Sequence, residues 1–316
     1  MDILVGYTGF VGSNLNRQHK FNSVFNSKNI TEAFGSGPDL CVYAGVRAEK
    51  FAADRFPQED LAHINETLEN IKNISPKKLV LISTVDVIPS PQDKTVYEDT
   101  LYEADRLTPY GRNRLYLENE LRKLYPAVLV IRLPALFGEG LKKNFIYDLI
   151  NFIPAMLKKE KFEELSAKAP LLGDFYREGE NGFYRLITDI SGNDRTMLKA
   201  SFEKIGFSAL NFTDSRSKFP FYNLKYLWDH IKILLDNEIK LAHMATEPVS
   251  AGEIYRAVYG KDFVNETMPK PFDYAFFKTR HAELLYGREG YVFDKYKIIP
   301  EVVSFINNKF DRLGDK

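Results

Sequence analysis

The sequence has a single cysteine and no excess of either charge, and both features narrow the classes of protein to consider. Cys41 alone cannot form an internal disulfide, and it excludes a metal site built from several cysteines. Its apolar neighbours predict a buried strand thiol, which fits a reducing compartment. Lysine plus arginine and aspartate plus glutamate number 43 each. No net basic field therefore attracts nucleic acid or an anionic membrane.

Long apolar runs and paired histidines are also absent. No hydrophobic stretch approaches the roughly 18 residues that cross a bilayer. A glycine turn that begins at Gly6 leaves no room for a signal peptide, so we expect a cytoplasmic protein. The five histidines show no pair four residues apart and no neighbouring cysteine. We therefore expect no metal site.

What the chain does have, at its start, is a Gly-x-x-Gly-x-x-Gly turn formed by Gly6, Gly9 and Gly12, between an apolar run and a helical stretch. Glycine lets the backbone turn tightly and approach a pyrophosphate, whose charge is met by free N–H groups at the helix start. The turn predicts a dinucleotide site that also includes Phe10 and Val11. Taken alone, the spacing fits a plain strand-to-helix turn as well.

Short apolar segments alternate with helical patterns through the first half of the chain. The segments that predict strands are residues 3–5, 24–25, 40–44, 79–83 and 128–133. Residues 61–74 and 110–124 have the apolar spacing of helices. This alternation predicts an α/β fold with a Rossmann-like, doubly wound parallel sheet. A ligand would bind beyond the carboxyl ends of the strands, beside the first strand.

The pattern changes after Gly138. Residues 144–158 predict a helix, and the polar stretch 159–218 has no clear period. The remaining periodic segments are helical at 224–236, 250–259 and 298–310, and strand-like at 240–247. We expect the strand-like segment to rejoin the main sheet.

A second group of residues favours hydride-transfer chemistry. Ser83 and Thr84 end a strand, Tyr110 opens a helix, and Arg114 lies on the same helix face as Tyr110. A hydroxyl, a phenol and a cation placed in this way can converge on one carbonyl or alcohol.

With these elements in this order, the chain resembles the extended short-chain dehydrogenase/reductase superfamily, in particular its NAD(P)-dependent sugar-nucleotide epimerase/dehydratase branch. The match covers nearly the whole length. Its elements are the glycine turn, the strand 39–45, Asn65, Ser83-Thr84, Tyr110 and the segment 132–138. The resemblance implies that Tyr110 is the acid/base that exchanges a proton with the sugar, and that Thr84 binds the same oxygen. A tyrosine with an ordinary pKa of roughly 10 then needs a nearby cation to favour its phenolate.

Two residues depart from the family pattern. The family has Tyr-x-x-x-Lys, whose lysine touches the cofactor ribose and lowers the tyrosine pKa, whereas this chain has Arg114. Arginine and lysine are not interchangeable. With Arg114 the protein is a working variant with adjusted ribose contacts, a slow enzyme, or a protein that binds ligand without turnover. Alternatively, Arg114 is simply a surface arginine.

Asp86 is the second departure. The 4,6-dehydratases of the family have an acidic pair after the threonine, whereas Val85-Asp86 follows here. Half of the pair is missing, which favours reduction or epimerisation over dehydration. Asp86 either acts on the substrate as one acid/base or caps the following turn.

The second strand ends near Asn26, where an Asp or Glu would hold the ribose 2′-hydroxyl of NAD. Asn26, Ser27 and Lys28 stand there instead, which favours NADP, with NAD as the alternative. The further cofactor contacts in the predicted site are Ala44, Gly45, Tyr110, Arg114 and Pro134. Arg47 is either a phosphate contact or a surface residue.

Substrate contacts are expected from Thr84 and Asp86, and from Lys143 and Asn144, which follow the Gly138 turn where relatives contact the diphosphate. An ordinary helix cap is the competing interpretation of Asn144. We expect residues 1–140, with the returning strand, to bind NAD(P), and residues 141–316 to form mainly a smaller substrate-binding region interleaved with the core.

The sequence thus predicts an NAD(P)-dependent ketoreductase or epimerase of nucleotide-activated sugars, in polysaccharide or deoxysugar biosynthesis. The alternative is a non-catalytic NAD(P)-binding or regulatory protein of the same fold, and a third hypothesis is an enzyme of small non-sugar ketones. Helices such as 61–74 and 110–124 pair across a two-fold axis in many relatives, so we also expect a homodimer.

Overall fold

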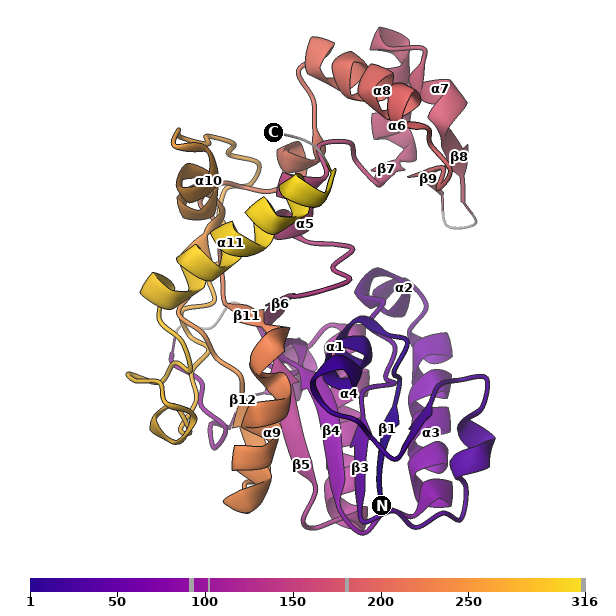
Figure 1. Ribbon diagram of the computed structural model, residues 1–316, viewed down its shortest axis with the longest axis vertical. Coiled ribbons are helices and arrows are strands. Elements are labelled where there is room, and N and C mark those ends of the chain that lie inside the picture. Colours follow the sequence, from indigo (N-terminus) through magenta and orange to yellow (C-terminus); the bar gives the residue numbers. More distant parts are fainter. Residues whose placement is uncertain (91–93, 102, 180–181, 314–316) are drawn as a thin grey trace. The chain divides into compact units, whose positions relative to one another are not determined.

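The computed structural model describes residues 1–90, 94–101, 103–179 and 182–313, and the chain divides into two compact units (Figure 1). Unit 1 comprises Met1–Leu141, Lys218–Val249 and Phe272–Glu301. Unit 2 comprises Lys142–Ser217, Ser250–Pro271 and the chain from Val302 onward.

Unit 1 is built on a six-stranded parallel sheet with the strand order β12-β5-β4-β3-β1-β2. Its strands are β1 (Asp2–Val5), β2 (Ser23–Phe25), β3 (Leu40–Tyr43), β4 (Leu79–Thr84), β5 (Leu129–Leu133) and β12 (Leu241–His243). Because the strand order reverses between β1 and β3, the crevice of the sheet lies at their carboxyl ends.

Helices cover both faces of this sheet. They are α1 (Phe10–Gln18), α3 (Pro57–Ile74), α4 (Pro109–Leu124) and α9 (Leu227–Asp236). Side chains alternate between the faces of a strand, and Ile3, Cys41 and Leu79 are buried in one core cluster with residues of α3 and α4. Figure 1 shows α9 in front of the sheet and α4 behind it. The predicted doubly wound parallel sheet and the buried thiol of Cys41 are therefore confirmed.

The side chain of Gln18 connects α1 to α9 and to the segment that precedes α9. The amide of Gln18 donates to the Leu224 carbonyl oxygen at 2.9 Å and accepts from the Trp228 N–H at 3.0 Å. The helix that follows the glycine turn is therefore held at its far end.

The other elements that lie in unit 1 or begin there are α2 (Lys50–Arg55), β6 (Ala135–Phe137), β10 (Lys218–Phe219), β11 (Phe221–Asn223), β13 (Val249–Ser250) and α11 (Lys295–Leu313). Ser250 of β13 and the part of α11 from Val302 onward belong to unit 2.

Unit 2 has a hydrophobic core of its own and a three-stranded antiparallel sheet in the order β7-β9-β8. Leu165, Leu172, Leu198 and Phe202 are buried in this core. Its elements are α5 (Phe145–Ile150), β7 (Met156–Lys158), α6 (Lys159–Lys168), α7 (Leu172–Phe175), β8 (Tyr176–Glu178), β9 (Phe183–Leu186), α8 (Gly192–Lys204) and α10 (Ala251–Tyr259).

The prediction of a helix over residues 144–158 is wrong beyond residue 150. Helix α5 ends at Ile150, and Met156–Lys158 form β7. Pro154 lies between them, and proline lacks the N–H that a helix interior requires and restricts the residue before it. Among the helices of the described residues, none combines the length and the apolar character that a membrane span requires.

Candidate active site

The glycine turn lies at the carboxyl end of β1, beside the end of β3. Gly6 has a φ of +92°, and a Cβ atom there would lie 2.6 Å from the backbone of Ala44 and Gly45. A Cβ atom on Gly12 would lie 2.1 Å from the Gly6 carbonyl oxygen. Only glycine therefore allows the turn to meet β3 and α1 to pack on the turn. The structure brings Gly6, Gly12, Ala44 and Gly45 together, as the dinucleotide prediction requires.

The N-terminus of α1 is open to an anion. Gly9 is the N-cap and provides no side-chain cap, and the first turn has no acidic residue. Phe10 and Val11, which begin the helix, are partly exposed. The first N–H groups of a helix have no partner within the helix, and the helix dipole favours negative charge there. The turn and helix start thus fit the pyrophosphate of a dinucleotide.

The segment after β2 forms a tight turn beside the glycine turn. The Gly6 N–H donates to the Phe25 carbonyl oxygen at 2.7 Å. The Asn26 side-chain oxygen accepts from the Lys28 N–H at 2.9 Å, so this side chain is used locally. Ser27 and Lys28 are exposed. The turn therefore presents a hydroxyl and a cation, and no carboxylate.

Thr84 and Asp86 are linked to each other at the end of β4. Thr84 Oγ1 accepts the Asp86 N–H at 3.2 Å and donates to Asp86 Oδ2 at 3.1 Å. Thr84 is therefore the residue that caps the 3₁₀ turn Val85–Val87. The second oxygen of the carboxylate, Asp86 Oδ1, lies 2.5 Å from Nζ of Lys50, the first residue of α2.

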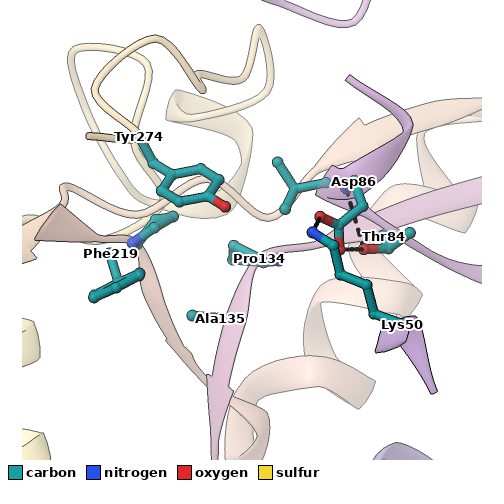
Figure 2. A pocket seen from close by; sticks show the side chains of 9 residues that line it. Lys50, Thr84, Asp86, Pro134, Ala135, Phe219 and Tyr274 are labelled. Atoms are coloured by element: carbon teal, nitrogen blue, oxygen red, sulfur yellow. Dashed lines mark hydrogen bonds and ion pairs between the residues drawn. The ribbon is translucent and has the colours of Figure 1, made fainter. Parts of the chain in front are cut away.

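These three side chains line one side of a cavity of about 190 Å³ in unit 1 (Figure 2). The other lining residues are Val85, Pro134, Ala135, Phe219, Pro220 and Tyr274. Figure 2 shows the Tyr274 hydroxyl directed toward the side that holds Lys50 and Asp86. The cavity thus has a polar wall that can bind oxygen atoms and a largely apolar wall opposite it.

Tyr110 lies in the first turn of α4 and is only 6% exposed. Its N–H donates to Asp54 Oδ1 at 2.9 Å. A Cβ atom on the next residue, Gly111, would lie 2.0 Å from the Asp86 carbonyl oxygen. The start of α4 therefore packs directly on the turn that carries Asp86. Among the described residues, the ones that line the cavity do not include Tyr110.

Arg114 is buried, so the interpretation as a surface arginine is wrong. It is 3% exposed, and its guanidinium carbon lies 3.9 Å from the centre of the Tyr110 ring. One end of the guanidinium pairs with Asp60 on α3, and the other donates to the Arg47 carbonyl oxygen at 2.5 Å. Asn113 donates to the same Asp60 carboxylate at 2.8 Å. Arg114 thereby fastens α4 to α3 and to the loop after β3.

Burial and the charges of two ion pairs act together on the pKa of Tyr110. Burial raises the pKa of Tyr110. The positive charges of Arg114 and Lys50 lower this pKa, and the negative charges of Asp86 and Asp60 raise it. The net direction is upward. Burial alone would lower the pKa of Lys50, but the Asp86 carboxylate raises it above its usual value. The ammonium is thus the form of Lys50 near neutral pH.

A buried charge network holds β4 in place beneath the site. The Ser83 hydroxyl donates to Glu118 Oε1 at 2.6 Å. Arg132 Nη2 on β5 donates to Glu118 Oε2 at 2.6 Å, and Glu118 is fully buried. Arg132 Nη1 also lies 3.3 Å from His243 Nε2 on β12. Ser83 therefore has a positioning role next to Thr84, and the network links α4 to neighbouring strands.

Lys143 and Asn144 belong to unit 2. Asn144 Oδ1 accepts the N–H groups of Ile146 and Tyr147 at 3.0 Å and 3.2 Å. Asn144 is therefore the N-cap of α5, the competing interpretation of this residue. Its φ of +102° is rare for a residue other than glycine. Lys143 is exposed.

The predicted site included Thr84, Asp86 and Pro134 of the cavity but not its other lining residues, among them Lys50 and Tyr274. Lys50 follows the carboxyl end of the strand at 40–44, which is a signal for the same sheet edge as Thr84. Tyr274 lies in a segment with no periodic pattern, so nothing in the sequence indicated its place in the cavity wall.

The parallel sheet, the glycine turn and the threonine at the end of β4 define a Rossmann-like α/β fold with a dinucleotide-type crevice. Neither a family model nor a curated protein sequence matches the chain. Solved structures do match it, over almost the full length of both chains.

The chain is similar to dTDP-4-dehydrorhamnose reductase from Yersinia enterocolitica, at 13% identity and a TM-score of 0.62, over 97% of this chain and 98% of that one. It is similar to RMD from Pseudomonas aeruginosa complexed with NADPH, at 14% identity and a TM-score of 0.62, over 98% and 99%. It is also similar to UDP-N-acetylglucosamine 4-epimerase from Methanobrevibacter ruminantium in complex with UDP-N-acetylmuramic acid, at 12% identity and a TM-score of 0.61, over 97% and 96%. At such low identity these likenesses show the fold, which is the one that the sequence resemblance implies.

Proposed function

We propose that the protein is an NAD(P)-dependent oxidoreductase of nucleotide-activated sugars, a ketoreductase or epimerase of polysaccharide or deoxysugar biosynthesis. One observation carries the proposal. The glycine turn at the end of β1 and the Thr84, Asp86 and Lys50 side chains beyond β4 lie at the same edge of the parallel sheet. A dinucleotide and a polar substrate bind at that edge of such a sheet.

The dinucleotide would supply or accept a hydride when bound. Gly6, Gly9 and Gly12 and the start of α1 would hold its pyrophosphate, next to Ala44 and Gly45. Ser27 and Lys28 are exposed after β2, where no carboxylate would repel a 2′-phosphate. We therefore favour NADP(H) over NAD.

The chain's own residues would handle the proton and orient the sugar. In the reductive direction Tyr110 gives its phenolic proton to the oxygen of the reduced carbon, and in the oxidative direction it takes the proton back. Thr84 turns its hydroxyl from Asp86 to the same oxygen. Pro134, Ala135 and Phe219 line the cavity, where their apolar atoms would pack against the bound ligands.

The further parts of the proposal rest on the resemblance. Reduction or epimerisation is favoured over dehydration because Val85 stands beside Asp86 where the 4,6-dehydratases have the other acid of the pair. Unit 2 would supply substrate contacts such as Lys143, and α3 and α4 would pair in a homodimer.

A second candidate function has one observation in its favour. Both ends of the Arg114 guanidinium are already engaged, by Asp60 and by the Arg47 carbonyl oxygen. A protein whose helix cation cannot reach the ribose could bind NAD(P) without turnover. This candidate is a nucleotide-binding or regulatory protein of the same fold.

Stopped-flow absorbance of bound NADPH against a panel of nucleotide-activated keto sugars separates the two candidates. We expect the reduced-nicotinamide band to decay in the parent. We expect Tyr110→Phe to bind NADPH normally and to turn over at least about 100-fold more slowly. Tyr116→Phe is the matched control, because Tyr116 is on the same helix and 39% exposed. No decay across the panel supports the non-catalytic candidate, and normal turnover by Tyr110→Phe removes the role of Tyr110.

A further inference from the structure

The arginine at the position of the family lysine is already committed to another task. Arg114 is buried between α4 and α3, with Asp60 at one end of its guanidinium and the Arg47 carbonyl oxygen at the other. Asp60 is itself buried. Turning Arg114 toward a ligand would leave a buried carboxylate without its cation, which is costly. Arg114 therefore positions α4, and with it Tyr110.

A second cation is available on the cavity side. Lys50 begins α2, its side chain is 48% exposed, and it lines the cavity together with Thr84. Asp86 Oδ1 holds its Nζ at 2.5 Å. An ammonium has three donors, so the ion pair with Asp86 leaves donors for an oxygen atom in the cavity. Figure 2 shows this ammonium beside the Thr84 and Asp86 oxygens.

We propose that Lys50 on α2 supplies the positive charge at the reacting centre. By the resemblance, that charge would come from a lysine on the helix of Tyr110. In this division of work Arg114 holds the helix, and Lys50 faces the cavity, anchored by Asp86. The inference rests on the proposed function, in which Tyr110 is the acid/base.

The charges around Tyr110 make the proposal testable, because it predicts the direction in which each substitution changes the pKa of Tyr110. The charged groups that act on its hydroxyl are Arg114 on α4, Asp60 on α3, Lys50 on α2 and Asp86 on the 3₁₀ turn. Asp54 on α2 accepts the backbone N–H of Tyr110. Removal of a nearby cation destabilises the phenolate, and removal of a nearby anion stabilises it. Neutralising Lys50 must therefore raise the pKa of Tyr110, and neutralising Asp86 must lower it.

The experiment is a titration of the Tyr110 ring by NMR in the cofactor-free protein. The Cζ resonance of Tyr110 is assigned by its loss in Tyr110→Phe and followed in Lys50→Met, Lys50→Arg and Asp86→Asn. The matched control is Lys72→Met. Lys72 is on α3 with a side chain 40% exposed and pairs with Glu69 at 2.7 Å, much as Lys50 pairs with Asp86.

We expect the midpoint of Tyr110 to rise by about half a pH unit or more in Lys50→Met and to fall in Asp86→Asn. Lys50→Arg and Lys72→Met should leave it near the parent value. A midpoint in Lys50→Met equal to that in Lys72→Met overturns the proposal. If Lys50→Met fails to fold, Lys50→Gln and Asp86→Asn decide the matter in the same way.

The activity provides a second readout. The acid limb of the pH–rate profile in the oxidative direction should move to higher pH in Lys50→Met and be restored in Lys50→Arg. Because the NMR titration needs neither cofactor nor substrate, it decides the role of Lys50 even where no sugar is turned over. Absence of turnover in the parent would count against the proposed function alone.

Discussion

The two ion pairs beside Tyr110 each join a carboxylate to a cation, but their surroundings differ. Arg114 and Asp60 have side chains 4% and 9% exposed, whereas Lys50 and Asp86 have side chains 48% and 24% exposed. A buried pair is costly to break because the remaining charge has no water to solvate it. An exposed pair contributes little to stability. The comparison teaches that the first pair fixes the helix, while the second can exchange partners with a ligand.

The largest effect is expected from breaking the buried pair. Asp60→Leu leaves Arg114 as an uncompensated charge between α3 and α4 and removes an acceptor of Asn113. We expect the free energy of unfolding to fall by about 3–5 kcal/mol, measured by urea denaturation. The double variant Asp60→Leu/Arg114→Met should recover most of the loss, because it removes both charges. A loss below about 1 kcal/mol in the single variant would contradict a structural role for the pair.

A third carboxylate, that of Asp148, forms no ion pair with any residue that the structure describes, and it sharpens the comparison. Burial alone raises the pKa of Asp148 on α5 to about 7, against roughly 3.9 in an unfolded chain. The folded state therefore binds the proton more tightly. The stability that this proton contributes is complete below about pH 4 and is lost as the pH rises through about 7.

Asp148→Asn should remove this pH dependence. We expect the parent to lose stability between about pH 4 and pH 7 and the variant to lose less over the same interval. Urea denaturation at a series of pH values measures both. Parallel curves for the two proteins would show that Asp148 does not hold its proton in the folded state.

Lysine in place of Arg114 tests whether the buried pair takes part in the reaction. Lysine cannot reach Asp60 and the Arg47 carbonyl oxygen together as the guanidinium does. We expect Arg114→Lys to destabilise the protein by about 1–3 kcal/mol and to leave turnover within about tenfold of the parent. A gain of turnover well beyond tenfold would mean that a helix lysine is the missing catalytic part, and would contradict the division of work between Arg114 and Lys50.

The smallest effect on stability is expected at the exposed pair. Asp86→Asn should change the free energy of unfolding by no more than about 1 kcal/mol, since its partner Lys50 remains solvated. The same urea experiment measures it. A loss as large as that of Asp60→Leu would show that both pairs are structural and would remove the distinction on which the account rests.

The sequence predicted what depends on local pattern. The glycine turn after β1 could be predicted because its three glycines are close together in the chain. The strands and the helix of Tyr110 could be predicted from the spacing of their apolar residues. Thr84 and Tyr110 could be singled out because a strand end and a helix start mark them. Their chemical roles stay predictions.

What the sequence could not predict depends on partners far apart in the chain. Asp60 lies 54 residues before Arg114, and Lys50 lies 36 residues before Asp86. No periodicity connects such residues, so neither the burial of Arg114 nor the second cation was expected. A second region was expected after residue 140, but the helices and strands within residues 159–218 were not predicted. These residues are mostly charged and polar, and a small core such as that of Leu165 and Phe202 leaves only a weak pattern.

The central claim is that this chain transfers a hydride to a sugar carbon with Tyr110 as proton donor. NADPH carrying deuterium at C4, in each stereochemical form, is incubated with the panel of nucleotide-activated keto sugars, and the products are analysed by mass spectrometry. We expect deuterium on the sugar for one of the two forms with the parent and with Tyr116→Phe, and at least about 100-fold less in the same time with Tyr110→Phe. A parent protein that binds both labelled cofactors and transfers deuterium to no sugar of the panel would contradict it.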